Sequence, residues 1–212
     1  MDKIYIDNPL SSALDLGNLS YLDIRIKDTD GLNLYINSEV PKLKQAFLSK
    51  LPESYNGSRR LYRSFRIDPT KHRPSSEALW RRIKRELPFP TVNPFVDIVN
   101  FLSLSLQIPY GLYDLDKIKG SISVAVGGRD DYYQGIRKDQ INLEGKITLK
   151  DSIGPFGNPS SDSNRTATAK GTQNILIVMF LPAENTIKQE VIQTTRALFE
   201  RFFTYQAVAG DT

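Results

Sequence analysis

Apolar residues recur at strand spacing in some short segments of the chain and at helical spacing in others. Segments 3–6 and 21–26 are predicted to be short strands, and segments 121–126 and 146–151 alternate as half-buried strands do. The run 175–181 (ILIVMFL) is apolar throughout, which is typical of a strand in the centre of a sheet. The chain therefore contains the strands of at least one sheet.

Helical spacing predicts five helices, which cover Ser38 or Glu39 to Lys50, residues 58–66, Ser75 or Ser76 to Glu86, the residues after Asn93, and the residues from Thr186. Pro41 must then lie in the first turn of its helix. Thr186 and Gln189 are spaced as a capping box. Strands and helices in this order predict an α+β fold, a mixed sheet with packed helices.

The helix that begins at Asn93 is apolar around most of its circumference, which is typical of a buried helix. Asparagine is a favoured N-cap. Pro94 fits the first helical position because an N–H at that position has no acceptor within the helix. Polar residues at intervals of three, three and four form one stripe along it, made by Asp97, Asn100, Ser103 and Gln107. A buried stripe of this kind is either bonded by its neighbours or lines a cavity for water or ligand.

The composition of the chain argues against several classes of protein and of functional site. No apolar run approaches the roughly 18 residues of a membrane span, and the N-terminus lacks the basic-then-apolar order of a signal peptide, so a cytoplasmic protein without a membrane partner is expected. With no cysteine and only His72, no disulfide, His/Cys zinc site or cofactor is expected. The same count argues against a Ser–His–Asp triad, and no catalytic residue is assigned.

Positive charge is concentrated in one stretch of the chain. Ten Lys or Arg and two acids lie between Arg59 and Arg85, whereas the whole chain carries a net charge of +4. The stretch is either a phosphate-binding footprint or a pair of solvated helix faces. The residues predicted to contact RNA are Arg59, Arg60, Arg63, Lys71, Arg73, Arg81, Arg82 and Arg85.

Several polar residues allow both a functional and a structural interpretation. Residues 152–171 form a polar segment without periodicity, and such long loops are usually functional or disordered. Its Arg165 could clamp a carboxylate or phosphate, or could simply be exposed. Asp114 and Asp116 could do acid–base work, but Asp-Leu-Asp-Lys is more typical of a turn whose acids cap backbone amides and pair with Lys117. Asp97 is expected to bond loop amides between Pro109 and Gly111.

The order of residues around the central helix resembles a known family. The B3/B4 editing region of the bacterial phenylalanyl-tRNA synthetase β subunit contains N-N-V-V-D-V-T-N-Y, and this chain has the similar NPFVDIVNF at residues 93–101. The family continues with Q-P-L-H-A-F-D-L-D-K-L and a strand that opens with Gly. The corresponding residues here are IPYGLYDLDKI at 108–118 and then Gly120. Freestanding B3/B4 proteins are still more similar, because they share a segment like 62–70 (YRSFRIDPT) and a threonine-rich loop like 162–174.

The resemblance implies a B3/B4-like architecture and a single domain over residues 1–212. Residues 56–182 carry the resemblance, residues 1–55 form an N-terminal part that shows little of it, and residues 183–212 are expected to form a C-terminal helix. It also implies that Asn100 lines the pocket that holds the amino-acid end of misacylated tRNA.

The pocket that the resemblance implies is altered in this chain. The family has histidine at the position of Gly111, threonine at Val99 and glutamate at Val178. Glycine would open the pocket, and Tyr110 or Tyr113 could refill the space. The predicted ligand pocket comprises Asn100, Val99, Tyr110, Gly111, Arg165 and Val178. Structural support is expected from Asn93, Asp97, Asp114 and Asp116.

The resulting hypothesis is a tRNA-binding module that hydrolyses misacylated aminoacyl-tRNA in trans. An aminoacyl ester is already activated, so binding it beside an oriented water can supply much of the acceleration without a strong base. The alternative is a non-catalytic domain that binds an amino acid or a related small metabolite. A protein-interaction domain is a third interpretation, and aminoacylation itself is not expected.

Overall fold

A four-stranded sheet is built around the apolar run that the sequence places at its centre. In the computed structural model, which describes residues 4–6, 10–136, 140–184 and 187–210, β11 (Ile175–Pro182) lies between β2 (Leu14–Leu22) and β4 (Tyr110–Asp114). The short β13 (Ala207–Gly210) pairs with the other edge of β2. All three pairs are antiparallel, and every residue of β11 is buried, which confirms the prediction for this strand.

A second sheet of five strands has the order β1-β5-β8-β9-β10. Its strands are β1 (Ile4–Ile6), β5 (Ile122–Val126), β8 (Ile147–Lys150), β9 (Pro155–Asn158) and β10 (Ser161–Asp162). Because β1 and β5 are parallel and the other pairs are antiparallel, the sheet is mixed, as predicted. Two further pairs join β12 (Phe203–Thr204) to β3 (Arg25–Ile26) and β6 (Tyr132–Gln134) to β7 (Gln140–Asn142).

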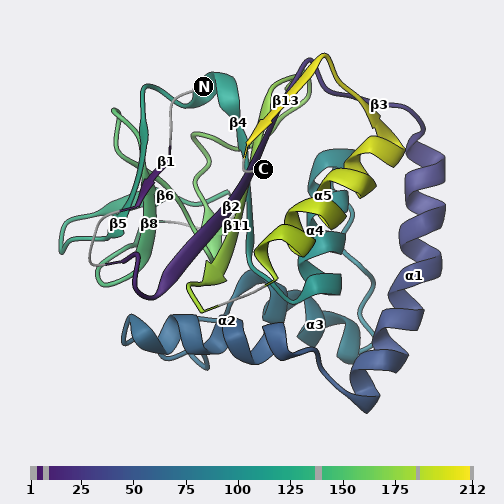
Figure 1. The fold of residues 1–212 in the computed structure, drawn as a ribbon, viewed down its shortest axis with the longest axis horizontal. Coiled ribbons are helices and arrows are strands. Elements are labelled where there is room, and N and C mark those ends of the chain that lie inside the picture. The colour runs from purple at the N-terminus through teal and green to yellow at the C-terminus, as the bar shows by residue number, and fades with distance from the viewer. Residues whose placement is uncertain (1–3, 7–9, 137–139, 185–186, 211–212) are drawn as a thin grey trace.

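The helices gather against one face and one end of the β11 sheet (Figure 1). They are α1 (Thr29–Ser49), α2 (Glu53–Ser64), α3 (Ser75–Lys84), α4 (Pro94–Leu106) and α5 (Lys188–Phe202), with a 3₁₀ turn η1 (Leu115–Lys117) after β4. Figure 1 shows α1, α3, α4 and α5 on one side of the sheet, the five-stranded sheet on the other, and α2 across the lower end. The fold is therefore α+β. No helix in the described ranges combines the length and the apolar character that crossing a membrane requires.

Two hydrophobic clusters fill the spaces on either side of β11. Its side chains alternate, so that Ile177 and Met179 belong to the cluster under the helices while Val178 belongs to the cluster between the sheets. The same alternation on β4 places Leu112 under the helices and Tyr113 between the sheets. This alternation decides which predicted pocket residues can share a cavity.

The N-terminal half departs from the predicted elements. α1 begins well before the predicted start and carries Pro41 inside it rather than in its first turn. Asp28 caps the longer helix by accepting a hydrogen bond from the Gly31 amide at 2.9 Å. The buried side chains of Leu32, Ile36 and Val40 stabilise the helix by more than the backbone hydrogen bond that Pro41 removes would have contributed.

Other element boundaries also differ from the sequence prediction. The predicted strand 21–26 corresponds to the end of β2 and to β3, and residues 14–20 of β2 were not predicted. α2 begins at Glu53, five residues before the predicted start. The C-terminal region holds β12 and β13 as well as α5, so it is not a helix alone. The predicted capping box at Thr186 lies outside the described residues, and α5 begins at Lys188.

Candidate functional site

The polar stripe of α4 is largely bonded by the chain itself. Asn93 is the N-cap, as predicted, and its side chain accepts hydrogen bonds from the Phe95 and Val96 amides at 3.1 Å. Ser103 Oγ donates to the Ile108 carbonyl at 2.7 Å, and Gln107 Nε2 donates to the Leu104 carbonyl at 2.6 Å. These groups hold the two ends of α4 through hydrogen bonds within the chain.

Asp97 supports the helix from a different side than predicted. Its Oδ1 accepts a hydrogen bond from the Val92 amide at 2.7 Å rather than from amides between Pro109 and Gly111. Helical side chains tilt toward the N-terminus, so a carboxylate in the first turn reaches the residues before the helix. Burial raises the pKa of Asp97 although backbone amides oppose the change.

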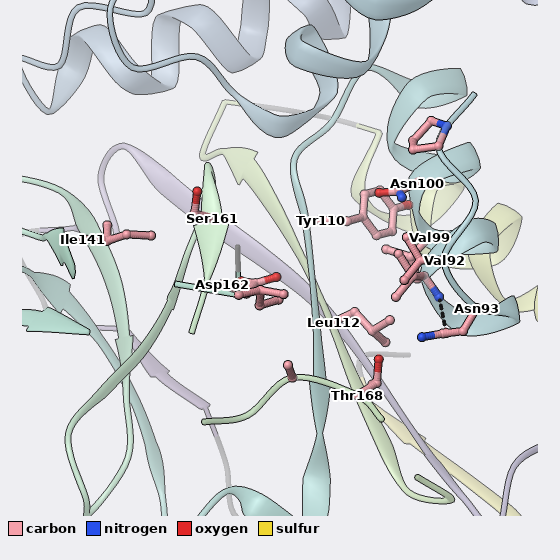
Figure 2. Close-up of a pocket in the computed structure, with 14 residues that line it drawn as sticks. Val92, Asn93, Val99, Asn100, Tyr110, Leu112, Ile141, Ser161, Asp162 and Thr168 are labelled. Atoms are coloured by element: carbon pink, nitrogen blue, oxygen red, sulfur yellow. Dashed lines mark hydrogen bonds between the residues drawn. The ribbon is translucent and has the colours of Figure 1, made fainter. Parts of the chain in front are cut away.

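Asn100 is the member of the stripe that remains available. It is half-buried, and its side-chain amide has no hydrogen-bond partner among the described residues. It lines a cavity of about 360 Å³ between α4, β4 and β10 (Figure 2). Of the two predicted roles of the stripe, Asn100 therefore has a place beside a cavity, and the other members are bonded within the chain.

Three parts of the chain form the cavity walls (Figure 2). The wall from α4 and the segment before it contains Pro90, Val92, Asn93, Val96, Val99 and Asn100, and β4 contributes Tyr110 and Leu112. The opposite wall contains Ile136, Ile141, Ser161, Asp162, Ala167 and Thr168. Most of these side chains are apolar, and the polar groups among them are amides, hydroxyls and one carboxyl.

Val99 and Tyr110 lie where the predicted pocket places them. Val99 presents an apolar side chain to the cavity from α4, and the Tyr110 ring reaches the same side of the cavity from β4. The Tyr110 hydroxyl is 2.7 Å from Thr195 Oγ1 on α5, so this tyrosine also ties the sheet to that helix. Burial raises the pKa of Tyr110, and the phenol stays neutral.

Gly111 and Val178 do not line this cavity, which corrects their predicted place. They are paired across β4 and β11 and face the space between the two sheets, and Val178 is 0% exposed. The Tyr113 ring covers Gly111, and a Cβ built there would overlap the Tyr113 hydroxyl. Of the two tyrosines proposed to refill the space beside Gly111, Tyr113 does so.

A carboxyl group that the sequence prediction missed borders the cavity. Asp162 Oδ1 accepts a hydrogen bond from the Tyr113 hydroxyl at 2.7 Å, and the Leu112 backbone N–H also donates to this carboxyl. Burial raises the pKa of Asp162 to about 7, although the two donors oppose the change. An acid in a polar loop carries no sequence signal of burial, and the only hint was its position at the start of the threonine-rich segment 162–174.

The raised pKa of Asp162 makes stability depend on pH. Between its ordinary pKa of 3.8 and about 7, the folded protein holds a proton that the unfolded chain has released, so this stabilisation is complete below the lower value and is lost as the pH rises through about 7. Burial, with the nearby Asp162, raises the pKa of Tyr113 and of Tyr133, so both phenols stay neutral in this range.

Asp162→Asn is therefore expected to flatten the pH dependence of stability. Its melting temperature should fall less than that of the wild type between about pH 5 and about pH 8. Thermal unfolding of both proteins in matched buffers measures the difference. Parallel curves over this range would contradict the raised pKa.

Arg165 lies away from the cavity and binds a carboxylate of the chain itself, which corrects its predicted place. Its guanidinium forms two bonds of 2.9 Å to Asp151 and also donates to the Lys117 and Gly154 carbonyls. The Asp151 side chain is 0% exposed. Desolvation acts to raise the pKa of Asp151, but Arg165 and three backbone amides outweigh it and hold this pKa below its ordinary value.

Arg165→Lys is expected to lower the free energy of unfolding by about 1–2 kcal/mol, because lysine keeps the charge but loses the forked pair of bonds. Urea unfolding measures the change. Arg25→Lys is the control, because the Arg25–Asp23 pair is exposed and should shift stability by less than about 0.5 kcal/mol. Unchanged stability of Arg165→Lys would contradict this structural role.

Asp114 and Asp116 hold the turn after β4. Asp114 Oδ1 caps η1 by accepting from the Asp116 amide at 3.2 Å, while its Oδ2 accepts from the Thr172 hydroxyl and lies 3.3 Å from Lys117 Nζ. The Asp116 carboxylate accepts hydrogen bonds from the Asn174 side chain at both of its oxygens. The turn interpretation of Asp-Leu-Asp-Lys agrees with this geometry.

The predicted RNA-binding residues fall into two groups. Arg59 and Arg81 bind the buried Glu77, Arg60 binds Glu53 and Glu184, and Arg82 donates to the Pro88 carbonyl. The second group is exposed and forms no ion pair within the described ranges, and it comprises Arg63, Lys71, Arg73 and Arg85. Internal ion pairs therefore occupy much of the charge that the sequence assigned to phosphates.

No group of three or more His, Cys, Asp or Glu gathers as a metal site in the part of the chain that the structure describes. His72 lies in a separate open groove with Lys71 and Lys146, and desolvation lowers its pKa.

Comparisons with known proteins agree with the resemblance noted from the sequence. The family model described as "B3/4 domain" matches residues 57–208. The phenylalanine–tRNA ligase beta subunit of Rickettsia felis is 32% identical over 97 residues, which are 45% of this chain and 12% of that protein. The same subunit of Rickettsia prowazekii is 31% identical over 163 residues, which are 76% of this chain and 19% of that protein.

The chain thus spans less than a fifth of the length of these relatives. Among solved structures, an N-terminal fragment of the phenylalanyl-tRNA synthetase beta-subunit from Pyrococcus horikoshii matches with a TM-score of 0.49 and 15% identity. That match covers 99% of this chain and 54% of the other.

Proposed function

This chain belongs to the B3/4 domain family, a tRNA-synthetase-related module, and from that premise we propose that its cavity binds the aminoacyl end of a tRNA and hydrolyses the ester. The observation that carries the proposal is the cavity of about 360 Å³ with the unpaired Asn100 amide on its wall. That volume is at the lower end of the range of small-molecule pockets and suits an amino-acid side chain with its ester.

The lining suits ester hydrolysis that depends on positioning. Asn100 and Thr168 offer an amide and a hydroxyl, which can bind the ester carbonyl and orient a water. The apolar side chains of Val96, Val99 and Leu112 can hold an amino-acid side chain and exclude bulk water. Holding an activated ester and a water in register supplies acceleration without a strong base.

Asn100→Ala is expected to lower deacylation at least tenfold, because a lost hydrogen bond of about 1.4 kcal/mol corresponds to that factor. Stability should change by less than about 0.5 kcal/mol, since the side chain bonds no described protein group. Asn56→Ala is the matched control, because Asn56 is exposed on α2 and away from the cavity. Wild-type rates in Asn100→Ala would contradict the assignment.

The direct test measures deacylation and tRNA binding by the purified chain. Tyr-tRNA, a D-aminoacyl-tRNA and a wider charged set serve as substrates, and binding is followed against salt concentration. Charge reversal at Arg63, Arg73 and Arg85 should weaken binding and reduce its salt dependence, because these side chains are exposed. The absence of both turnover and salt-sensitive tRNA binding would refute the proposal.

A non-catalytic amino-acid or metabolite binder is the second function that a specific observation favours. Arg59, Arg60 and Arg81 are already paired with carboxylates of the chain, which leaves a smaller basic surface for RNA. Ligand binding that persists after the charge reversals, without any binding of tRNA, would favour this function.

A further inference from the structure

We infer that Asp162 is the counter-ion of a protonated amine in the cavity, so that the site selects aminoacyl groups with a free α-ammonium over those whose amine is acylated. The inference deepens the proposed function, on which it rests for the identity of the ligand as an aminoacyl group. It is carried by the place of this carboxyl in the cavity wall and by the contacts that fix it there.

Asp162 is the one charged side chain among the described residues that line the cavity. No lysine or arginine in the described ranges forms an ion pair with it. A carboxylate that is partly removed from water is costly unless a cation or several donors face it. The cavity therefore offers a carboxyl group that lacks a cationic partner in the described part of the chain, and an ammonium beside it would favour its ionised form.

The known partners of Asp162 leave acceptor capacity unused. A carboxylate has about four lone-pair sites, and two neutral donors are present, namely the Tyr113 hydroxyl at 2.7 Å and the Leu112 amide. Both donors belong to β4, while the side chain also lines the cavity. Figure 2 shows Asp162 on β10, across the cavity from Val99 and Asn100.

The carboxyl is held rigidly by the residues behind it. Asp162 pairs with Gly157 in the β9–β10 hairpin, and the Tyr113 ring fits between Gly111 and Gly157, where neither glycine leaves room for a Cβ. Asn158 closes the hairpin by accepting hydrogen bonds from the two backbone amides before Asp162. A charge that is fixed before binding loses little entropy when a ligand arrives.

The other walls complement an aminoacyl ester in the same orientation. With the ammonium at Asp162, the apolar side chain can lie against Val96, Val99 and Leu112, and the carbonyl can reach Asn100 or Thr168. The described lining holds no cation to bind the carboxylate of a free amino acid. Esters and amides should therefore bind better than the corresponding zwitterions.

The test compares paired probes that differ at the amine. L-leucinamide, L-valinamide and L-phenylalaninamide are titrated into the full chain beside their N-acetyl derivatives, by NMR or calorimetry. The free amine of at least one pair should bind at least tenfold more tightly than its acetylated partner. Asp162→Asn should abolish this preference by weakening the free amine alone, while Asp130→Asn, at an exposed site outside the lining, should preserve it.

Several outcomes would overturn the inference. One is equal affinity of both probes for the wild type, a result that requires no variant to fold. Absence of binding by every amide, or an unchanged preference in Asp162→Asn, would do the same. If Asp162→Asn slows deacylation yet leaves the affinity for amides intact, the carboxyl acts on the reaction and not on the amine.

The two proposals fail separately. Selection of free amines without tRNA binding or turnover would refute the proposed function and leave the amine site standing. Equal deacylation of aminoacyl-tRNA and N-acetyl-aminoacyl-tRNA would refute the amine site and leave the function standing.

Discussion

Gly111→Ala should lower the free energy of unfolding by about 3–5 kcal/mol, because the new methyl group would overlap the Tyr113 hydroxyl and the adjacent edge of its ring. The ring has little freedom to move away. The Tyr113 ring packs edge-on against the Phe156 ring, with 4.9 Å between the ring centroids, and Gly157 confines it from the other side. Moving it would also break the buried hydrogen bond to Asp162. Chemical denaturation measures the loss.

A double-mutant cycle separates this clash from a general effect of alanine. Tyr113→Leu removes the hydroxyl and the ring atoms that the methyl group would meet, so Gly111→Ala should destabilise less in that background than in the wild type. Gly128→Ala is the control, because its Cβ would meet nothing nearer than 3.5 Å. Additive effects of Gly111→Ala and Tyr113→Leu would contradict the proposed overlap.

Elements with local signals were predictable from the sequence. The pair Asn93-Pro94 predicts the start of α4, because asparagine is a favoured N-cap and proline is favoured at the next position. The uninterrupted apolar run of β11 likewise indicates burial on both faces. β2 carries the polar residues Asp15 and Asn18 and is interrupted by Gly17, so its pairing with β11 decides its structure more than its own pattern does.

The site was predictable at Asn100 and not at Asp162. The helical spacing of the stripe placed Asn100 on a defined face of α4. Asp162 is placed at the cavity by contacts that are distant in the sequence, because Tyr113, 49 residues away, donates to it and β10 pairs with β9. The same limit explains Arg165 and Arg59, which were assigned to the ligand pocket and to RNA without knowledge of Asp151 and Glu77.

The two faces of β4 connect Gly111 with the cavity. The positions that resemble the family's histidine and glutamate, Gly111 and Val178, face the core between the sheets, where Tyr113 fills the space. The Tyr113 hydroxyl in turn fixes Asp162 at the cavity. A change at Gly111 is thus connected to the cavity through Tyr113 and Asp162.

The buried Glu77 carries the second large expected effect. Glu77→Gln should lower the free energy of unfolding by about 3–5 kcal/mol, because the carboxylate is 1% exposed and bridges Arg59 at 2.8 Å and Arg81 at 3.1 Å. A neutral amide in its place would leave the largely buried Arg59 guanidinium without a counter-charge. Denaturant unfolding of the variant and the wild type gives the difference.

Glu53→Gln is the matched control, because Glu53 pairs with Arg60 at a site where its side chain is 74% exposed, and the expected change is below about 0.5 kcal/mol. Arg59→Met combined with Glu77→Gln should recover part of the loss, since no charge is then buried alone. Equal effects of Glu77→Gln and Glu53→Gln would contradict the structural role. With that role, Arg59 substitutions act by unfolding the protein, and the proposed tRNA binding is better tested at the exposed Arg63, Arg73 and Arg85.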